Sequence, residues 1–446
     1  MDSNVFYPFL NKSFVTAVKG EGIYIYDSEG KRYIDGSSGA MTANLGHGLR
    51  EVTGRIKNQM DTLSFTYRTQ FTNLPVEELS IKIASLAPKP LSKVHYVNSG
   101  SEATESAMKL AKSYWNELGK VGKQMIISRW GSYHGSTMGS LSMSGNIGRR
   151  QSYHSYIELY PQLETPFCFH CPYEKEYPQC SLFCARELDR VISRIGENNI
   201  SAFIAEPIVG ASGAGITPPD DYFPLIKEIC EKHNILFIMD EVITGFGRTG
   251  ENFACNHWGV VPDIMVFGKG VSAGYAPLAG IIAHERIYNE IAMGSGEFST
   301  GHTFGGNPFS CSAGCSVVDY MMEHDIVAQV RDKGSYLMAE LKKLKDRSVL
   351  IADIRGKGLL IGVEIVRRKE GCISFERREK ITEKLVEICY SKGLIVYPSG
   401  GMINGTLGDS ILIAPPLTIS IEEINNMVNI LDDSIMELER SITNRE

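Results

Sequence analysis

Two short segments decide the fold: they read FIMDEVITGFGRTG at residues 237–250 and DIMVFGKG at residues 263–270. The first segment predicts a buried strand that ends in the carboxylates of Asp240 and Glu241 and continues into a glycine-rich turn. The second predicts another short apolar strand, which delivers Lys269 into a turn between two glycines. We therefore expect a carboxylate and a lysine at the ends of successive strands.

A carboxylate and a lysine in this arrangement suit the cofactor pyridoxal phosphate. A lysine amine forms a Schiff base with the cofactor aldehyde, and this is the role expected for Lys269. A carboxylate pairs with the pyridine nitrogen and keeps it protonated, so that the ring acts as an electron sink; this role falls to Asp240. The alternative is a surface lysine, with Asp240 as a helix cap.

Strand and helix patterns alternate from about Pro75 to Asp325. The expected strands are Val94–Val97, Met125–Ile127, Ala202–Ala205, Ile235–Met239, Ile264–Phe267 and Leu278–Ile282. Helical patterns lie between several of them, and this alternation predicts an α/β fold with a mostly parallel sheet covered by helices. Sites in such sheets gather at the carboxyl ends of the strands, and Glu206, Asp240 and Lys269 all fall at such ends.

The two ends of the chain predict a second, smaller unit. A hairpin is expected around the turn at residues 27–31, and beyond about residue 326 helices and short strands follow one another. We expect residues 1–75 and 326–446 to form a smaller α+β domain, and residues 76–325 to form a large cofactor-binding domain.

The composition restricts the class of protein. The chain has 446 residues, 43% of them apolar, and a formal net charge of −7 without a long basic run, which argues against nucleic acid as a partner. The N-terminal residues 1–8 lack the pattern of a signal peptide, and no apolar run approaches the ~20 residues of a membrane-spanning helix. Ten cysteines in a chain of this size do not resemble a secreted disulfide framework. A cytoplasmic protein is expected.

The segment NSGSEA at residues 98–103 follows the first strand of the large domain and opens a helix. Ser99 and Glu102 fit a capping box. A helix N-terminus with small residues also presents free backbone amides and a positive dipole potential to an anion. The segment therefore predicts either a helix cap alone or a phosphate site.

These motifs together resemble the class III (omega) aminotransferases, and the resemblance runs over nearly the whole chain. It rests on the apolar strand with Asp-Glu-Val, the Gly-Phe-Gly-Arg turn and the following Gly-Lys pair, and on Asn-Leu-Gly-His-Gly at residues 44–48. The resemblance implies a fold-type-I pyridoxal phosphate transferase in which Lys269 and Asp240 are the catalytic residues.

The resemblance also implies contacts to the cofactor. The phosphate loop of the family corresponds to Ser99, Gly100 and Ser101. The aromatic residue of the family's Tyr/Phe-His-Gly motif lies on one face of the pyridine ring, which gives this position to Tyr133, and Val242 would pack on the other face. Considered without the resemblance, Tyr133 fits a core residue better than a cofactor platform.

Three further residues receive roles from the same resemblance. Glu206 would lie beside the cofactor, although it also fits a carboxylate that caps the following turn. His134 would be a hydrogen-bonding neighbour of the cofactor site and not a catalytic residue. The hydroxyl of Thr303 would reach the phosphate bound by the other subunit, which implies a homodimer as the functional unit; the alternative is a glycine-rich loop without a ligand.

Four positions depart from the patterns of the family. Met41 stands where many relatives that use pyruvate have tryptophan, and it fits plain packing. Ala211 and Ile243 stand where the glutamate-using branch has glutamate and glutamine, which points away from ornithine- or GABA-type specificity. Gly405 stands where a mobile arginine binds the substrate carboxylate in the pyruvate-using branch. Either another basic residue, such as Arg68, or the backbone of this glycine-rich loop would have to take its place.

Four cysteines form a separate motif, Cys168-x2-Cys171-x8-Cys180-x3-Cys184. Two close pairs of this kind fit either a tetrahedral zinc or iron–sulfur site or a set of buried reduced thiols. The separation of the pairs is short for a zinc ribbon, and the expected chemistry needs no metal, so no metal ligand is assigned. His170 is either a bystander or a spare ligand.

The expected function is therefore a transaminase that moves an amino group from an amine or omega-amino acid to a keto acid. Pyruvate is favoured over 2-oxoglutarate as the acceptor. Lys269 would move the proton between the substrate carbon and the cofactor carbon. Two alternatives stay open: a mutase, racemase or lyase with the same lysine chemistry, and a non-catalytic metal or redox protein that uses the cysteine cluster.

Overall fold

The computed structural model describes residues 4–443, and within this range the centre of the molecule is a seven-stranded sheet. Residues 1–3 of the N-terminal stretch considered above lie outside the described residues. From edge to edge the strands are β4 (Leu91–Val97), β10 (Ala279–His284), β9 (Ile264–Phe267), β8 (Leu236–Asp240), β7 (Ile200–Ala205), β5 (Met125–Arg129) and β6 (Gln162–Leu163). Strand β10 is antiparallel to both neighbours, and the others pair in parallel. The mostly parallel sheet expected from the sequence is confirmed.

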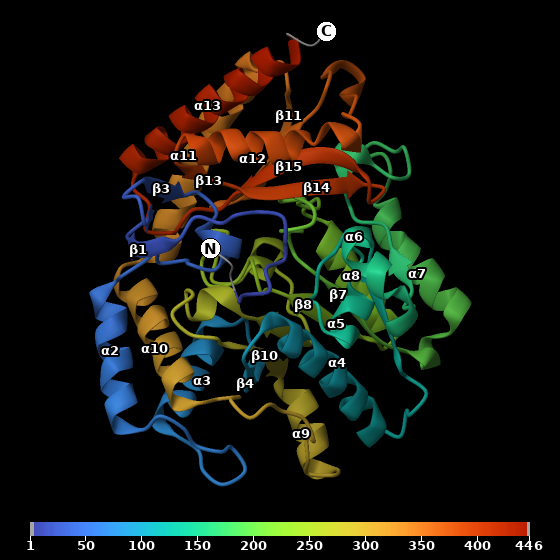
Figure 1. The fold of residues 1–446 in the computed structure, drawn as a ribbon. Helices are drawn as coiled ribbons and strands as arrows, with labels where there is room; N and C mark the ends of the chain where they lie inside the picture. Colours follow the sequence, from blue (N-terminus) through green and yellow to red (C-terminus); the bar gives the residue numbers. More distant parts are fainter. Residues whose placement is uncertain (1–3, 444–446) are drawn as a thin grey trace.

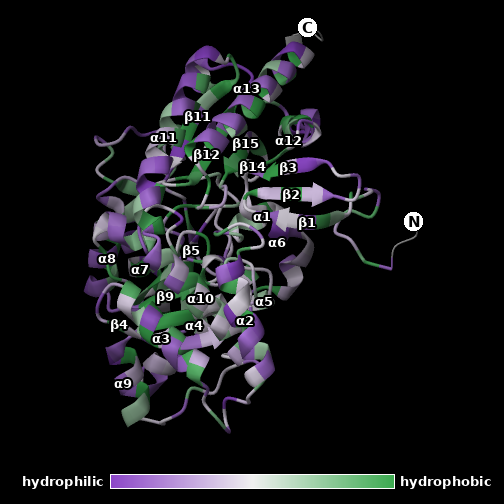
Figure 2. Cartoon of the chain, turned by 90° about the vertical axis from the view of Figure 1, so that its left-hand side faces the viewer, coloured by the Kyte–Doolittle hydropathy of each residue, from purple (hydrophilic) through white to green (hydrophobic). Residues whose placement is uncertain are grey.

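The central strands are buried on both faces. Every residue of β7, β8 and β9 is buried, as expected for parallel strands between two layers of helices. Successive residues of these strands belong to two different apolar clusters: Phe237 packs into one, and its neighbours Leu236 and Ile238 pack into the other. In Figure 2 the strands of the interior are largely hydrophobic, while outer helices such as α7 and α8 carry much of the hydrophilic colour.

Helices connect and cover these strands (Figure 1). Those of the central part are α3 (Leu74–Leu86), α4 (Gly100–Glu117), α5 (Met138–Met143), α6 (Ile147–Arg150), α7 (Phe183–Ile195), α8 (Tyr222–Lys232), α9 (Glu285–Met293) and α10 (Pro308–Glu323). Helix α4 packs its apolar side, including Ala103 and Ala107, into the cluster that also holds Ile238. Helix α8 packs Phe223 into the cluster on the other face.

Both ends of the chain meet in two smaller sheets. One has the order β1 (Ala17–Glu21), β2 (Tyr24–Asp27), β3 (Arg32–Asp35) and β13 (Leu394–Ile395); the other has the order β11 (Ile351–Lys357), β12 (Leu360–Ile365), β15 (Leu407–Ile413) and β14 (Tyr397–Ile403). Leu394 of β13 pairs in parallel with Ile34 of β3, which joins segments 360 residues apart. The expected hairpin is confirmed, since Asp27 Oδ1 accepts hydrogen bonds from the amides of Glu29 and Lys31.

Helices from both chain ends complete the molecule. They are α1 (Ser38–Met41), α2 (Arg50–Thr62), α11 (Ile326–Arg347), α12 (Ile381–Ser391) and α13 (Ile421–Thr443). Figure 1 shows α11, α12 and α13 beside the smaller sheets, away from the central sheet, and α2 beside α10. The exact division into domains stays a prediction. Among the described residues, no helix is long and apolar enough to cross a membrane.

Candidate active site

Asp240 and Lys269 lie at the same edge of the central sheet. Asp240 is the last residue of β8 and pairs with Val266 of β9, and Lys269 follows β9 after Gly268. Because the two strands are adjacent and parallel, their carboxyl ends bring the carboxylate and the amine to one place.

The Lys269 backbone and amine are both held in unusual settings. Its φ is +41°, which is rare for a residue with a side chain, and its Nζ donates a hydrogen bond of 2.7 Å to the carbonyl oxygen of Ala40. Burial lowers the pKa of Lys269 to about 8, although Asp240 and Glu206 act in the opposite direction. A lysine with this pKa has a substantial neutral fraction near neutral pH, which a base or nucleophile needs.

Asp240 is fixed by His134. The Nδ1 of His134 lies 2.7 Å from Oδ2 of Asp240, and Oδ1 accepts from the amide of Val242 at 3.1 Å. The Nε2 of His134 is buried without a partner among the described residues. The His134 amide donates to Ser144 Oγ, so this side chain enters the site from a well-held loop.

Glu206 binds the loop that carries Tyr133 and His134. Its Oε1 accepts from the amide of Tyr133 at 2.9 Å and its Oε2 from the amide of Gly210 at 3.1 Å. Burial raises the pKa of Glu206; Asp240 raises it further, and His134 lowers it. Glu206 therefore bonds the turn that follows β7, as one alternative predicts, and its position beside the cofactor stays a prediction.

The N-terminus of α4 fits a phosphate group. Ser99 and Glu102 form the expected capping box: Ser99 Oγ accepts from the amide of Glu102, and the Glu102 carboxylate accepts from the amide of Ser99. The amides of Gly100 and Ser101 donate no hydrogen bond within residues 4–443. A Cβ at Gly100 would lie 3.0 Å from Val242 Cγ1, so this loop passes close to Val242. Two free amides at the start of an 18-residue helix are suitable donors for a phosphate.

The buried Glu241 has a different task from its neighbour Asp240. Its carboxylate accepts from the amides of Ala254 and Cys255, at 2.9 and 2.7 Å. Burial raises its pKa, and these hydrogen bonds act against that rise. Glu241 thus holds the loop beyond the glycine-rich turn.

Arg248 connects the site edge with both chain ends, which the sequence did not suggest. Its fully buried guanidinium donates to the carbonyls of Leu359 and Pro415 and to the side chains of Ser38 and Asn44. Burial lowers its pKa to about 9. The signal in the sequence was the arginine of the Gly-Phe-Gly-Arg turn, but its partners are far away in the chain.

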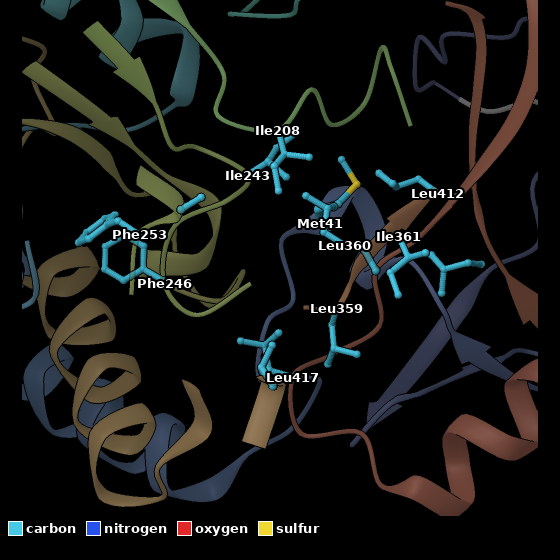
Figure 3. Close-up of a cluster of buried hydrophobic side chains, with 14 of the residues drawn as sticks. Met41, Ile208, Ile243, Phe246, Phe253, Leu359, Leu360, Ile361, Leu412 and Leu417 are labelled. Carbon is cyan, nitrogen blue, oxygen red and sulfur yellow. The ribbon is translucent and has the colours of Figure 1, made fainter. Parts of the chain in front are cut away.

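Met41 lies in the apolar core next to the site. It is fully buried, and Figure 3 shows it between Ile208 and Ile243 on one side and Leu360 and Leu412 on the other. The interpretation of Met41 as plain packing agrees with this position.

Two expected site residues lie in exposed loops of this chain. Thr303 is exposed in the turn before α10, while its neighbour His302 contacts Glu102 of α4 at 3.5 Å. Arg68 is also exposed and lies against Gly301, where an added Cβ would be 2.7 Å from its Nε. The structure gives neither of them a contact with Lys269 or Asp240.

The four cysteines line one small cavity of about 20 Å³. Burial raises the pKa of Cys168 and raises that of Cys184 to about 12. Across residues 4–443, no group of three or more histidine, cysteine or acidic side chains is arranged to hold a metal ion. His170 bonds Glu364 of β12, with 2.5 Å between Nε2 and Oε1, and so joins this segment to a smaller sheet.

A sheet edge that carries a lysine of lowered pKa, a carboxylate and a helix N-terminus with free amides suits a transferase that works with pyridoxal phosphate. The model of the family "Aminotransferase class-III" matches residues 9–435. The chain belongs to the class III aminotransferases, which use this cofactor, and the fold-type-I architecture is confirmed.

Relatives cover nearly the full length of the chain. The uncharacterized aminotransferase YodT of Bacillus subtilis is 42% identical over 99% of both chains. The putrescine–pyruvate aminotransferase of Pseudomonas aeruginosa is 34% identical, over 92% of this chain and 88% of its own.

Solved structures agree with the same family. A transaminase from the marine bacterium Virgibacillus has a TM-score of 0.92 and 32% identity, with 98% of each chain covered. An amine transaminase of an uncultivated Pseudomonas species, solved in its PLP-bound form, has a TM-score of 0.92 and 30% identity, with 98% of this chain and 99% of its own covered.

Proposed function

We propose that this aminotransferase moves an amino group from an amine or omega-amino acid to a keto acid, and that pyruvate is a better acceptor than 2-oxoglutarate. The observation that carries the proposal is Lys269, whose amine of lowered pKa lies at the same sheet edge as Asp240. Pyridoxal phosphate, when bound, supplies an aldehyde that condenses with the amine and a ring that takes up the electron pair left by proton loss.

Different residues of this chain would then bind the cofactor and transfer the proton. Asp240, oriented by His134, would hold the ring nitrogen, and the free amides of Gly100 and Ser101 would hold the phosphate. The amine of Lys269 would accept a proton from the donor carbon and return it one position away, since its pKa lies near the working pH.

The preference for pyruvate is supported by two small or apolar residues. Ile243 is buried and its Cδ1 would lie 2.6 Å from a Cβ at Gly210, the residue that precedes the uncharged Ala211. Neither side chain offers a partner for the second carboxylate of 2-oxoglutarate. The pyruvate-using relative of Pseudomonas aeruginosa supports the same choice.

Half-reactions test this proposal directly. The yellow holoenzyme is mixed with a panel of diamines and omega-amino acids without an acceptor, and the visible spectrum is followed. We expect bleaching that pyruvate reverses faster than 2-oxoglutarate does. Consumption of the amine without bleaching would instead support a mutase, racemase or lyase.

A lysine variant and a matched control complete that experiment. Lys269→Ala is expected to lose roughly 10²- to 10⁴-fold in rate, the range of proton transfer by a positioned side chain. Lys343→Ala serves as the control, because Lys343 is exposed and pairs only with Glu340 of its own helix among the described residues. Equal rates in both variants would exclude the role of Lys269.

We also propose a homodimer in which Thr303 serves the phosphate site of the partner subunit. Thr303 is exposed in the turn before α10. This position supports the proposal, because an exposed hydroxyl is available to a second subunit. Light scattering should give twice the mass of the chain, and Thr303→Ala should weaken cofactor binding without dissociating the dimer.

We also propose that the protein works in the cytoplasm. The ten free cysteines support a reducing compartment of this kind.

A further inference from the structure

One arginine near the site packs its guanidinium on a tyrosine ring. Arg149 belongs to the short helix α6, and its guanidinium carbon lies 4.5 Å from the centre of the Tyr133 ring. Within residues 4–443 this guanidinium donates no hydrogen bond and joins no ion pair. Five N–H donors on an exposed, stacked cation are therefore free to bind an anion.

Arg149 lies near the groups that are expected to react. Tyr133 follows β5, and its amide is held by Glu206 at the same edge as Asp240. Arg149 also contributes to the electrostatic environment of the Lys269 amine. The stacked guanidinium thus lies close to the lysine that handles the substrate.

Local structure holds α6 in this place. Asn146 Oδ1 caps the helix by accepting from the amide of Arg149 at 3.2 Å. On the other side, Ile147 packs against the turn between β14 and β15, where a Cβ at Gly405 would overlap Ile147 Cδ1 and lie 2.9 Å from its Cβ. Residues 399–416, which include this turn, carry no basic side chain. The positive charge at this side of the site therefore comes from α6 and not from the turn.

Two other arginines near the site, Arg248 and Arg150, are already engaged. Arg248 is fully buried and donates four hydrogen bonds. Arg150 is buried, donates to the carbonyl of Ser144 and lies over the Trp130 ring.

We propose that Arg149 is the residue that binds the carboxylate of the substrate, so that the enzyme acts on amino acids and keto acids through a bidentate guanidinium–carboxylate contact stacked on Tyr133. The planar fork of a guanidinium matches the two oxygens of a carboxylate. This inference rests on the proposed function, because it takes the substrates to be the amino acids and keto acids of that transamination. The same donors could instead face the cofactor phosphate, and the experiment separates these two anions.

The variants are Arg149→Met and Arg149→Lys, with Arg32→Met as the matched control. Arg32 is also exposed and also lies 4.5 Å from a tyrosine ring, that of Tyr24 in a smaller sheet. Met keeps the length of the apolar stem and removes the charge, while Lys keeps the charge and removes the planar fork.

The first readout is binding of an unreactive carboxylate, propionate, to the holoenzyme by calorimetry. We expect Arg149→Met to weaken it roughly 10- to 100-fold, as expected for loss of charge-assisted hydrogen bonds, and Arg149→Lys to restore only part of it. The second readout is the ratio of kcat/KM for an omega-amino acid to that for benzylamine, which should fall by a similar factor, mainly through KM. The Kd of pyridoxal phosphate for the apoprotein should stay within about threefold.

Two results would overturn the inference. Propionate binding that is equal in wild type, Arg149→Met and Arg32→Met would show that Arg149 binds no carboxylate. A parallel loss of cofactor affinity would assign the guanidinium to the phosphate. If wild type showed no transamination at all, the proposed function would fail, while propionate binding would still decide the role of Arg149.

Discussion

His134 and Asp240 form a buried pair, with 2.7 Å between Nδ1 and Oδ2, at the carboxyl end of β8. The contact leaves Asp240 with one oxygen on the imidazole and the other on the amide of Val242. A carboxylate in this setting is oriented before any ligand arrives, as its proposed role at the pyridine nitrogen requires.

Asp240→Asn should separate charge from shape. The amide fills the same space but carries no negative charge, so we expect roughly 10²- to 10³-fold slower amine half-reactions, the usual cost of one preorganised electrostatic contact. Stopped-flow absorbance measures the rate, and circular dichroism checks the fold. A rate within threefold of wild type would contradict the role of this carboxylate.

His134→Gln should act through Asp240. Loss of this hydrogen bond to Asp240 is expected to reduce the rate about 10-fold, less than Asp240→Asn does. The double variant tests the coupling: once Asn occupies position 240, the additional change at His134 should have little further effect. Additive losses would show that His134 acts independently of Asp240.

Arg248→Lys should lower stability much more than the same change at the surface. The buried guanidinium makes four hydrogen bonds across three segments of the chain, and a lysine cannot reach all of them. We expect a loss of about 2–4 kcal/mol from unsatisfied buried acceptors, measured as a lower thermal midpoint.

The control for this change is Arg331→Lys. Arg331 is an exposed arginine that pairs with Glu251 and donates one hydrogen bond to the carbonyl of Gly250, and exposed contacts of this kind are worth at most about 1 kcal/mol. If both variants lost the same stability, the buried network of Arg248 would not be important for the fold.

The parts of the site that the sequence predicted are those carried by local patterns. The apolar runs before Asp240 and Lys269 predicted two strand ends, and strand order then placed them side by side. The Ser-x-x-Glu spacing predicted the capping box of Ser99 and Glu102. In each case the residues that decide the geometry lie within a few positions of one another.

The parts that the sequence did not predict depend on contacts between distant segments. Arg149 reaches Tyr133 from a four-residue helix, and the Lys269 amine meets a carbonyl 229 positions away, that of Ala40. The antiparallel direction of β10 was not predicted either, although only a short helical turn, Lys269–Val271, lies between β9 and β10, which is too little for the crossover helix of a parallel pair. Periodicity carries no information on such pairings.

Gly405→Ala tests the packing of Ile147 on the turn between β14 and β15. Two costs add: a Cβ would overlap Ile147, and φ at this position is +73°. We expect a loss of about 2–4 kcal/mol from overpacking and backbone strain together. Removal of the obstructing side chain in Gly405→Ala/Ile147→Ala should recover the steric part.

Gly371→Ala is the matched control for the backbone part. Gly371 has the same φ of +73°, but the nearest atom to an added Cβ, Ile373 Cδ1, is 3.6 Å away. Its loss should be about 1–2 kcal/mol, the cost of the left-handed conformation alone. If the thermal midpoint fell equally in Gly405→Ala and Gly371→Ala, the side chain of Ile147 would move aside without lowering the stability of the fold.

Glu364→Gln should reduce the acid sensitivity of the protein. Glu364 is buried in β12, where burial would raise its pKa, but the hydrogen bond from His170 and the charge of Arg355 outweigh burial and lower it below its ordinary value of 4.5. A carboxyl with a lowered pKa adds stability above its unfolded pKa, and this stability is lost as pH falls through the folded pKa. Wild type should therefore be clearly more stable than Glu364→Gln at pH 7, and the difference in thermal midpoint should shrink below about pH 4.5.

The control is Glu340→Gln. This change affects only an exposed pair with Lys343 and should show a small difference in thermal midpoint at every pH. A difference for Glu364→Gln that stayed constant from pH 7 to pH 3 would mean that the carboxylate charge contributes nothing and that only the shape of the side chain matters.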